Sequence, residues 1–166
     1  LSLHDALPIL EEKMKVVVDA MGSDHYPDPE IIGAVKAAKN FSIEIILVGD
    51  KTIIEEKLAK ANTENLPISI HHTPDMVEMG EKAVESARAK PNNSMAAGMQ
   101  LVRDGEAQAF VTAGNTGAAM FNALRKLGRI KGVSRPALGG IIPVKNGRAI
   151  LIDMGANVDC RPEFLL

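Results

Sequence analysis

The segment AQAFVTAGNTGAAM, residues 107–120, contains the change of pattern that decides the fold class. Its beginning is apolar enough to predict a buried strand. Glycine and polar residues then interrupt the run, and small apolar residues that suit a helix follow. A strand that leads through a glycine turn into a helix is typical of the repeating unit of parallel α/β sheets.

The rest of the chain repeats this alternation of apolar runs and helical periodicity. The predicted strands are residues 14–20, 43–49, 66–72 and 107–113. The predicted helices are residues 29–39, 51–61, 80–89 and 94–103, and a segment from Asn115 or Thr116 to Leu127. Because most of these strands are apolar throughout, both faces of the sheet should be covered. We therefore expect an α/β fold of three layers, α/β/α, with a mostly parallel sheet.

Polar, glycine-bearing segments follow three of the predicted strands. They are DAMGSDHYP (residues 19–27), AGNTGA (113–118) and DMGAN (153–157). The last follows a predicted strand at 148–153, which a hairpin-like turn at Lys145-Asn146-Gly147 joins to another at 138–144. Ligands of parallel sheets gather at the carboxyl ends of strands, so these three segments are the candidate site.

AGNTGA has two interpretations. The N-terminus of a helix binds anions, and Gly114 and Gly117 would let the backbone approach an oxyanion to which Asn115 and Thr116 donate. Alternatively, Asn115 or Thr116 caps the helix and the glycines make the turn. The segment is neither a Walker loop nor a dinucleotide fingerprint.

The charge pattern favours an anionic ligand or partner. The chain has a net charge of −2, yet residues 107–152 contain no Asp or Glu. A basic surface beside a phosphate site would attract an acidic substrate or protein. The basic residues of this span are Arg125, Lys126, Arg129, Lys131, Arg135, Lys145 and Arg148.

Composition excludes several classes of protein. Aromatic residues make up 3% of the 166 residues, which leaves little for stacking on nucleic acid bases. No apolar run approaches the length of a membrane span. The single cysteine, Cys160, has no partner for an internal disulfide, which fits a reducing cytosol, and it is not expected to be a nucleophile.

We expect no metal ion and no cofactor. Asp19, Asp24 and His25 are ligand types in one segment, but Asp19 more simply caps the loop and Gly22 makes a turn. His71 and His72 are adjacent in a strand and point to opposite faces, so we interpret them as structural. Ser94 after KPNN is expected to be a helix N-cap whose hydroxyl could also face the site.

Both ends of the sequence look atypical. Residues 1–13 show neither helix nor strand periodicity, and we expect them to be a foreign or ragged extension before Met14. The final FLL stands where a new helix begins after Arg161-Pro162. We therefore expect residues 14–166 to be the N-terminal portion of one domain whose C-terminal half is missing.

Several motifs in order resemble the PlsX family of bacterial phosphate acyltransferases. They are VDAMGSDHYPDP, ILVGD, KPNNSM, TAGNTGA, GRIKGVSRPAL and DMGANVDCRPE. The resemblance runs from Met14 to the end of the sequence. One departure is Ser23, which stands where the family usually has a second glycine, and a serine restricts the backbone if that position needs a positive φ.

The resemblance implies a function and partners. The family transfers a fatty acyl group from acyl carrier protein to inorganic phosphate, which yields acyl phosphate for phospholipid synthesis. It implies a fold related to isocitrate and isopropylmalate dehydrogenases, and a cytoplasmic homodimer that touches the membrane peripherally through the missing half. Arg129, Lys131 and Arg135 would meet acyl carrier protein. A phosphotransacetylase-like enzyme that uses acyl-CoA and a non-catalytic phosphate-binding module stay open as alternatives.

The resemblance also implies which residues line the site. Asn115, Thr116 and Asp153 are the catalytic candidates, although no general base is assigned among them. In the same cleft, the expected phosphate-binding residues are Asp19, Gly22, Ser94, Gly114, Asn115, Thr116, Gly117, Gly155 and Asn157.

Overall fold

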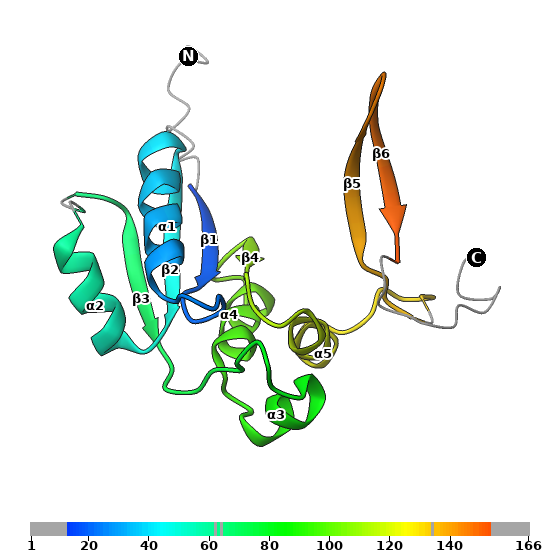
Figure 1. Ribbon diagram of the computed structural model, residues 1–166, viewed down its shortest axis with the longest axis horizontal. Helices are drawn as coiled ribbons and strands as arrows, with labels where there is room; N and C mark the ends of the chain where they lie inside the picture. The colour runs from blue at the N-terminus through cyan, green and yellow to red at the C-terminus, as the bar shows by residue number, and fades with distance from the viewer. Residues whose placement is uncertain (1–12, 62, 64, 134, 154–166) are drawn as a thin grey trace, which may run out of the picture.

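The computed structural model describes residues 13–61, 63, 65–133 and 135–153. Its main sheet has four strands in the order β3-β2-β1-β4, and each strand runs parallel to the strands beside it (Figure 1). The strands are β1 (Met14–Asp19), β2 (Ile43–Gly49), β3 (Ile68–His72) and β4 (Ala109–Val111). The predicted α/β class and parallel sheet are confirmed.

Helices cover both faces of this sheet. The helices are α1 (Asp28–Asn40), α2 (Lys51–Lys60), α3 (Ala83–Ala89), α4 (Ser94–Arg103) and α5 (Thr116–Lys126). Helix α1 packs with α2 and the strands on one side, and α4 packs on β1, β2 and β4. Helices α3 and α5 pack on each other, and α5 also packs on α4. This arrangement fits three layers.

The strands show why both faces are covered. Successive side chains of a strand point to opposite faces. In β2, Ile45 and Leu47 pack with buried residues of α1, whereas Val48 packs with Val17 of β1 and Leu101 of α4. All of these side chains are nearly or fully buried, so the continuous apolar run reflects two cores rather than one.

Several element ends differ from the sequence prediction, and two of these differences and one misassigned cap have a local reason. The helix expected at 80–89 begins only at Ala83, because the carbonyl of Glu81 accepts a side-chain hydrogen bond from Asn115 at 3.2 Å. The strand expected at 107–113 shortens to Ala109–Val111, because the chain turns where Thr112 bonds Asp19. The expected N-cap Ser94 is wrong, since Asn93 caps α4 through Ala96 N–H at 3.1 Å.

The predicted hairpin is confirmed, and it forms a sheet of its own. Strands β5 (Gly139–Val144) and β6 (Gly147–Ile152) pair antiparallel. Within the described ranges they contact no other strand or helix, and Figure 1 shows them standing apart from the four-stranded sheet. Ile141 and Ile150, which face each other across the pair, are 67% and 73% exposed.

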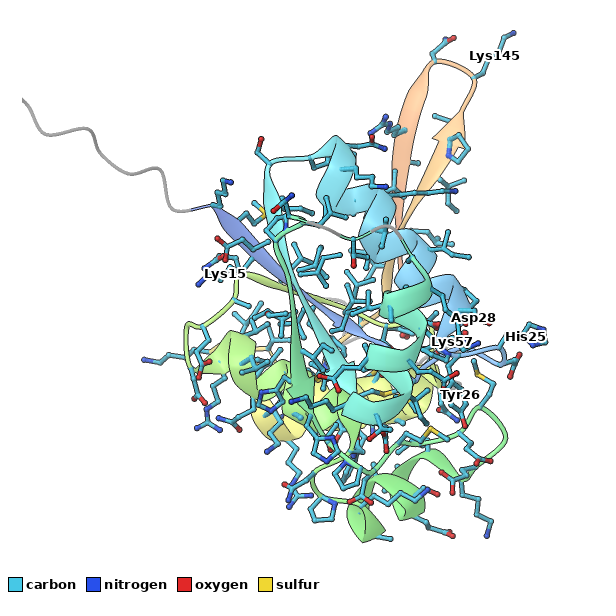
Figure 2. The ribbon with its side chains drawn as sticks, turned by 90° about the vertical axis from the view of Figure 1, so that its left-hand side faces the viewer. Lys15, His25, Tyr26, Asp28, Lys57 and Lys145 are labelled. Carbon is cyan, nitrogen blue, oxygen red and sulfur yellow. The ribbon has the colours of Figure 1, made fainter. Side chains whose placement is uncertain are left out.

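Two helices of the main body are joined by an ion pair at the surface. Lys57 Nζ of α2 lies 2.7 Å from Asp28 Oδ1 at the start of α1. Figure 2 labels both residues. Among the residues that the structure describes, no helix combines the length and apolarity that crossing a bilayer requires.

Candidate functional site

The carboxyl ends of β1 and β4 bring together two residues that lie far apart in the sequence. Val18 of β1 is in register with Val111 of β4, so Asp19 and Thr112 leave the sheet side by side. The Thr112 hydroxyl donates to Asp19 Oδ2 at 2.7 Å. Asp19 Oδ1 accepts from the Met21 N–H at 3.1 Å, which confirms that Asp19 caps its own loop. One carboxylate thus bonds both loops of the site.

Two glycines allow these loops to touch. A Cβ atom on Gly22 would lie 2.9 Å from each of three atoms: Asp19 Oδ2, Thr112 Oγ1 and the backbone nitrogen of Gly114. A Cβ atom on Gly114 would lie 3.2 Å from the Gly22 Cα and carbonyl oxygen. Contacts under 3.0 Å essentially never occur for real Cβ atoms, so Gly22 admits no side chain here. Packing alone therefore explains both glycines, and their role with phosphate stays a prediction.

The buried carboxylate of Asp19 is electrostatically unusual. Its side chain is 0% exposed, and desolvation by burial raises its pKa above the ordinary 3.8. The side chains of Thr112 and Ser94 and the N–H of Met21 act in the opposite direction, because they donate to the carboxylate. Nearby Glu30 adds a small further increase in the pKa.

Asn115 caps α5, as one of the two sequence interpretations predicted. Its Oδ1 accepts from the Ala118 N–H at 3.0 Å. Its Nδ2 donates to the backbone carbonyls of Met79 and Glu81 at 3.0 and 3.2 Å. The side-chain donor of Asn115 is therefore engaged by protein carbonyls rather than directed at a ligand.

The remaining donors of this loop belong to the first turn of α5. Thr116 and Gly117 are exposed and are the first two residues of the helix. Their N–H groups precede the intrahelical hydrogen-bond ladder, and they lie at the positive end of the helix dipole. Gly117 has no room for a side chain, because a Cβ atom there would lie 2.9 Å from the Cβ atom of Ala83 in α3. Helix N-termini in general attract small anions, so anion binding at Thr116 and Gly117 stays a prediction.

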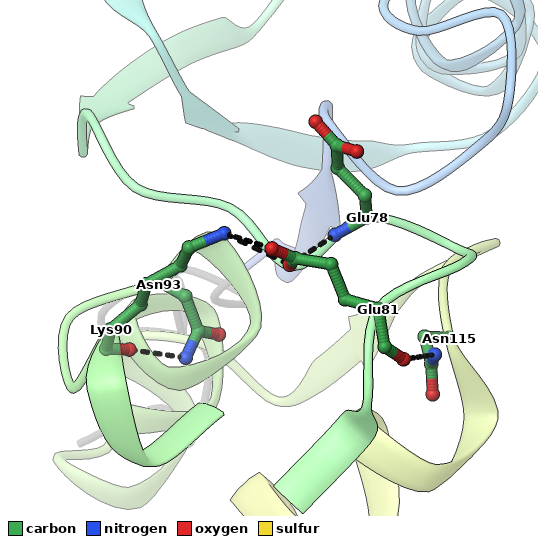
Figure 3. A network of polar contacts seen from close by, with 5 residues as sticks. All are labelled: Glu78, Glu81, Lys90, Asn93 and Asn115. Atoms are coloured by element: carbon green, nitrogen blue, oxygen red, sulfur yellow. Dashed lines mark hydrogen bonds and ion pairs between the residues drawn. The ribbon is translucent and has the colours of Figure 1, made fainter. Parts of the chain in front are cut away.

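A polar network holds the opposite wall of this loop (Figure 3). Lys90 Nζ donates to Glu81 Oε1 at 2.7 Å, and the Glu78 N–H donates to Glu81 Oε2 at 3.0 Å. The pKa of Glu81 lies below its usual value. The hydrogen bond from Lys90 is the largest cause, and the hydrogen bond from the Glu78 N–H is the next largest. Since Asn115 bonds the backbone carbonyl of Glu81, this network fixes the segment on which the α5 cap rests.

Buried amides join α4 to α5 beneath the site. Asn122 Nδ2 donates to Asn93 Oδ1 at 3.2 Å and to the Ala118 carbonyl at 3.0 Å. Asn93 and Asn122 are 0% and 1% exposed. The neighbouring Ser94 is also buried, and its side chain acts on the pKa of Asp19. The structure therefore brings four of the predicted residues into one cluster, Asp19, Gly22, Ser94 and Gly114.

A hollow of about 170 Å³ opens between the loop after β1 and residues 78–80. Asp24 and Glu78 are among its walls, so its outer side is acidic. This acidic lining does not favour an anion in the hollow, whereas the α5 terminus carries the positive end of a helix dipole. Ser23 also lines the hollow. Its φ is not positive, so a serine at this position does not strain the backbone.

Other predicted residues are not brought to this cluster. Asp153 follows β6, in the separate hairpin sheet, and has a φ of 63°. Its N–H donates to the Leu138 carbonyl at 2.7 Å. Gly155 and Asn157 lie outside the described residues. The basic residues Arg129, Lys131 and Arg135 lie on the exposed connection between α5 and β5.

Histidines and acids do not gather into a metal site in the part of the chain that the structure describes. His25 is exposed and points away from the body of the protein in Figure 2. His72 has a structural role, because its Nδ1 accepts from the Lys51 N–H at 3.1 Å.

Thr112 is the site residue that the sequence interpretation missed. The sequence pattern places it in the strand predicted at 107–113, and nothing in its own identity distinguishes it from a β-branched sheet residue. The available signal was positional, since it directly follows the strand that pairs with the strand ending in Asp19. Recognising it required the strand order, which the sequence pattern alone does not supply.

The fold and this cluster define a parallel α/β protein with a polar site at the carboxyl edge of its sheet. The chain belongs to the fatty acid synthesis protein family, whose sequence model matches residues 14–166. It is 48% identical to the phosphate acyltransferase of Herpetosiphon aurantiacus over 153 residues, 92% of this chain and 42% of that protein. It is 50% identical to the phosphate acyltransferase of Koribacter versatilis over 152 residues, 90% of this chain and 42% of that protein. The chain therefore spans less than half the length of these curated relatives.

Proposed function

We propose that this chain is part of a phosphate acyltransferase that moves a fatty acyl group from acyl carrier protein to inorganic phosphate. The observation that carries the proposal is the exposed N-terminus of α5, where Thr116 and Gly117 present the first two N–H groups of the helix. This terminus lies at the carboxyl edge of a parallel sheet, in a chain whose relatives bear the name phosphate acyltransferase.

The reaction needs a bound nucleophile and a polarised thioester. A phosphate oxygen attacks the thioester carbonyl carbon and forms a C–O bond, and the C–S bond then breaks. The thiolate of the carrier leaves and takes up a proton, so that acyl phosphate and free thiol are the products. Positioning and electrostatic stabilisation of the oxyanion supply the catalysis in this scheme, with the α5 terminus holding either phosphate or the developing oxyanion.

The acyl donor would dock through the basic connection after α5. Arg129, Lys131 and Arg135 are exposed, and the whole span 107–152 lacks acidic residues. An acidic carrier protein complements this surface and would be steered to it at low salt.

The remaining parts of the proposal concern the complete enzyme. Asp153, Gly155 and Asn157 would join the site as the complete protein folds around it. The complete protein would have an isocitrate dehydrogenase-like architecture, form a cytoplasmic homodimer and touch the membrane peripherally. Residues 1–13 would lie outside its domain.

Acyl-phosphate formation tests the function. The natural full-length chain is incubated with palmitoyl-acyl carrier protein and inorganic phosphate, and the products are measured with and without phosphate. Phosphate-dependent acyl phosphate is the expected result. Product from acyl-CoA alone would favour the phosphotransacetylase-like enzyme, and phosphate binding without product from either donor would favour a binding module.

A further inference from the structure

The hydroxyl of Thr112 joins the two loops of the site through two hydrogen bonds. It donates to Asp19 Oδ2 at 2.7 Å and accepts from the Gly114 N–H at 3.0 Å. The Gly114 N–H stands two residues before the first helical residue of α5. Asp19 therefore acts on the α5 terminus through Thr112.

The surroundings leave this contact little freedom. Gly22 packs directly over it, with 2.9 Å from an added Cβ to both Thr112 Oγ1 and the Gly114 nitrogen. Asp19 is 0% exposed, so bulk water does not replace a lost hydroxyl at its carboxylate. A buried acceptor that loses its donor destabilises the arrangement that it held.

We propose that Thr112 is a positioning residue, whose hydroxyl sets the backbone of residues 112–114 so that the first turn of α5 binds phosphate. This inference rests on the proposed function, because it takes phosphate as the ligand of that turn. Thr112 itself touches no substrate in this scheme. It acts through Gly114, and Asp19 holds it in the one orientation in which its lone pair faces the Gly114 N–H.

Two substitutions separate the hydroxyl from the shape of the side chain. Thr112→Val keeps the branched shape and removes both hydrogen bonds, whereas Thr112→Ser keeps the hydroxyl and removes the methyl group. A matched control is Ile54→Val, which removes one methylene from a fully buried side chain of α2 and leaves the site loops unaltered. All variants are made in the natural full-length chain.

The first readout is steady-state kinetics with phosphate as the varied substrate. Thr112→Val should raise the KM for phosphate roughly tenfold while kcat changes little, because a mispositioned loop loses binding in ground and transition states alike. Thr112→Ser should restore the wild-type KM. A merely structural role would instead lower the active fraction, which reduces apparent kcat and leaves KM unchanged, as expected for Ile54→Val.

The second readout is hydrogen exchange of the peptide that contains Gly114, which needs no catalysis. Exchange should be faster in Thr112→Val and close to wild type in the other two variants.

Unchanged exchange and unchanged KM in Thr112→Val would overturn the inference while the enzyme's function stands. Faster exchange with unchanged KM would show that phosphate does not bind at this loop, and would remove Thr112 from the reaction. If the wild-type chain folds but forms no acyl phosphate, the proposed function fails, and the exchange comparison still decides whether Thr112 orders the loop.

Discussion

Gly22 and Gly114 lie in contact through their backbones, although 91 intervening positions separate two loops that the sheet places side by side. A Cβ atom on Gly22 would come within 2.9 Å of the Gly114 nitrogen. Neither residue has a positive φ, so the two glycines are required by proximity and not by backbone conformation. The contact makes the geometry of each loop depend on the other.

Replacing Gly22 with alanine tests this dependence. Gly22→Ala should lower the free energy of unfolding by about 1–3 kcal/mol, because its methyl group is overpacked against three polar atoms. It should also raise the KM for phosphate. The matched control is Gly33→Ala in α1, where an added Cβ meets nothing within 4 Å. That variant should be neutral or stabilised by up to about 1 kcal/mol. Equal unfolding curves for the two variants would contradict the packing argument.

Replacing Asn115 with aspartate separates the capping hydrogen bond from the charge at the α5 terminus. Asn115→Asp keeps an acceptor for the Ala118 N–H, but it loses the donor to Met79 and Glu81 and adds a negative charge at the α5 terminus. Phosphate should therefore bind more weakly, with KM raised about tenfold or more, while the helix remains capped. The matched control is Asp50→Ala, which removes the cap of α2, a helix that does not contact α5. It should cost about 1 kcal/mol of stability and leave KM unchanged. A wild-type KM in Asn115→Asp would exclude anion binding at α5.

The pKa of Asp19 predicts a dependence of stability on pH. Burial raises the pKa of the native carboxyl above its ordinary 3.8, so the native state holds this proton more tightly than the unfolded chain does. The contribution of Asp19 to the free energy of unfolding should consequently fall as pH rises from 3.8 through the raised value. Asp19→Asn removes this contribution. The difference between wild type and variant is measured by urea unfolding from about pH 4 to about pH 7. A difference that does not vary with pH would contradict the prediction.

The basic connection after α5 gives a prediction for the acyl donor. Lys131→Glu should raise the KM for acyl carrier protein several-fold at low salt, roughly fivefold, and the effect should shrink at high salt. Lys36→Glu makes the same change of charge on an exposed position of α1 and should leave this KM near wild type. Equal effects of the two variants would make the attraction a property of net charge and not of this surface.

The order of the elements followed from sequence because the strands are long apolar runs and the helices have clear periodicity. The bounds of β2 and α4 were predicted as the structure has them, Ile43–Gly49 and Ser94–Arg103. The errors occur where a side chain competes with the backbone. Asn115 takes the carbonyl of Glu81 and delays α3, and Asn93 replaces Ser94 as the cap of α4.

The sequence predicted which loops form the site, but it did not predict which residues of these loops contact each other. Sequence pattern identified the segments after β1 and β4, because glycine and polar residues followed apolar runs in both. It did not identify their pairing, because strand order depends on long-range packing that local pattern does not encode. Thr112 was missed for this reason. The sequence pattern also placed Asp153 in the site, because Asp153 follows an apolar strand as Asp19 does. That strand is β6, which pairs with β5 in the separate hairpin.

The position of β1 in the middle of the sheet has a consequence for the order of folding during synthesis. Asp19 and Thr112 are 93 residues apart, and β1 has no neighbour on that side until β4 exists. At a translation rate of about 5–20 residues per second, the partner strand is completed roughly 5 to 20 seconds after β1. The β1–β2–β3 portion has its sequence available well before then, with one edge of its sheet unpaired. The contacts of the site are thus the last that these four strands make, and the nascent chain exposes an open strand edge from the completion of β1 until β4 is made.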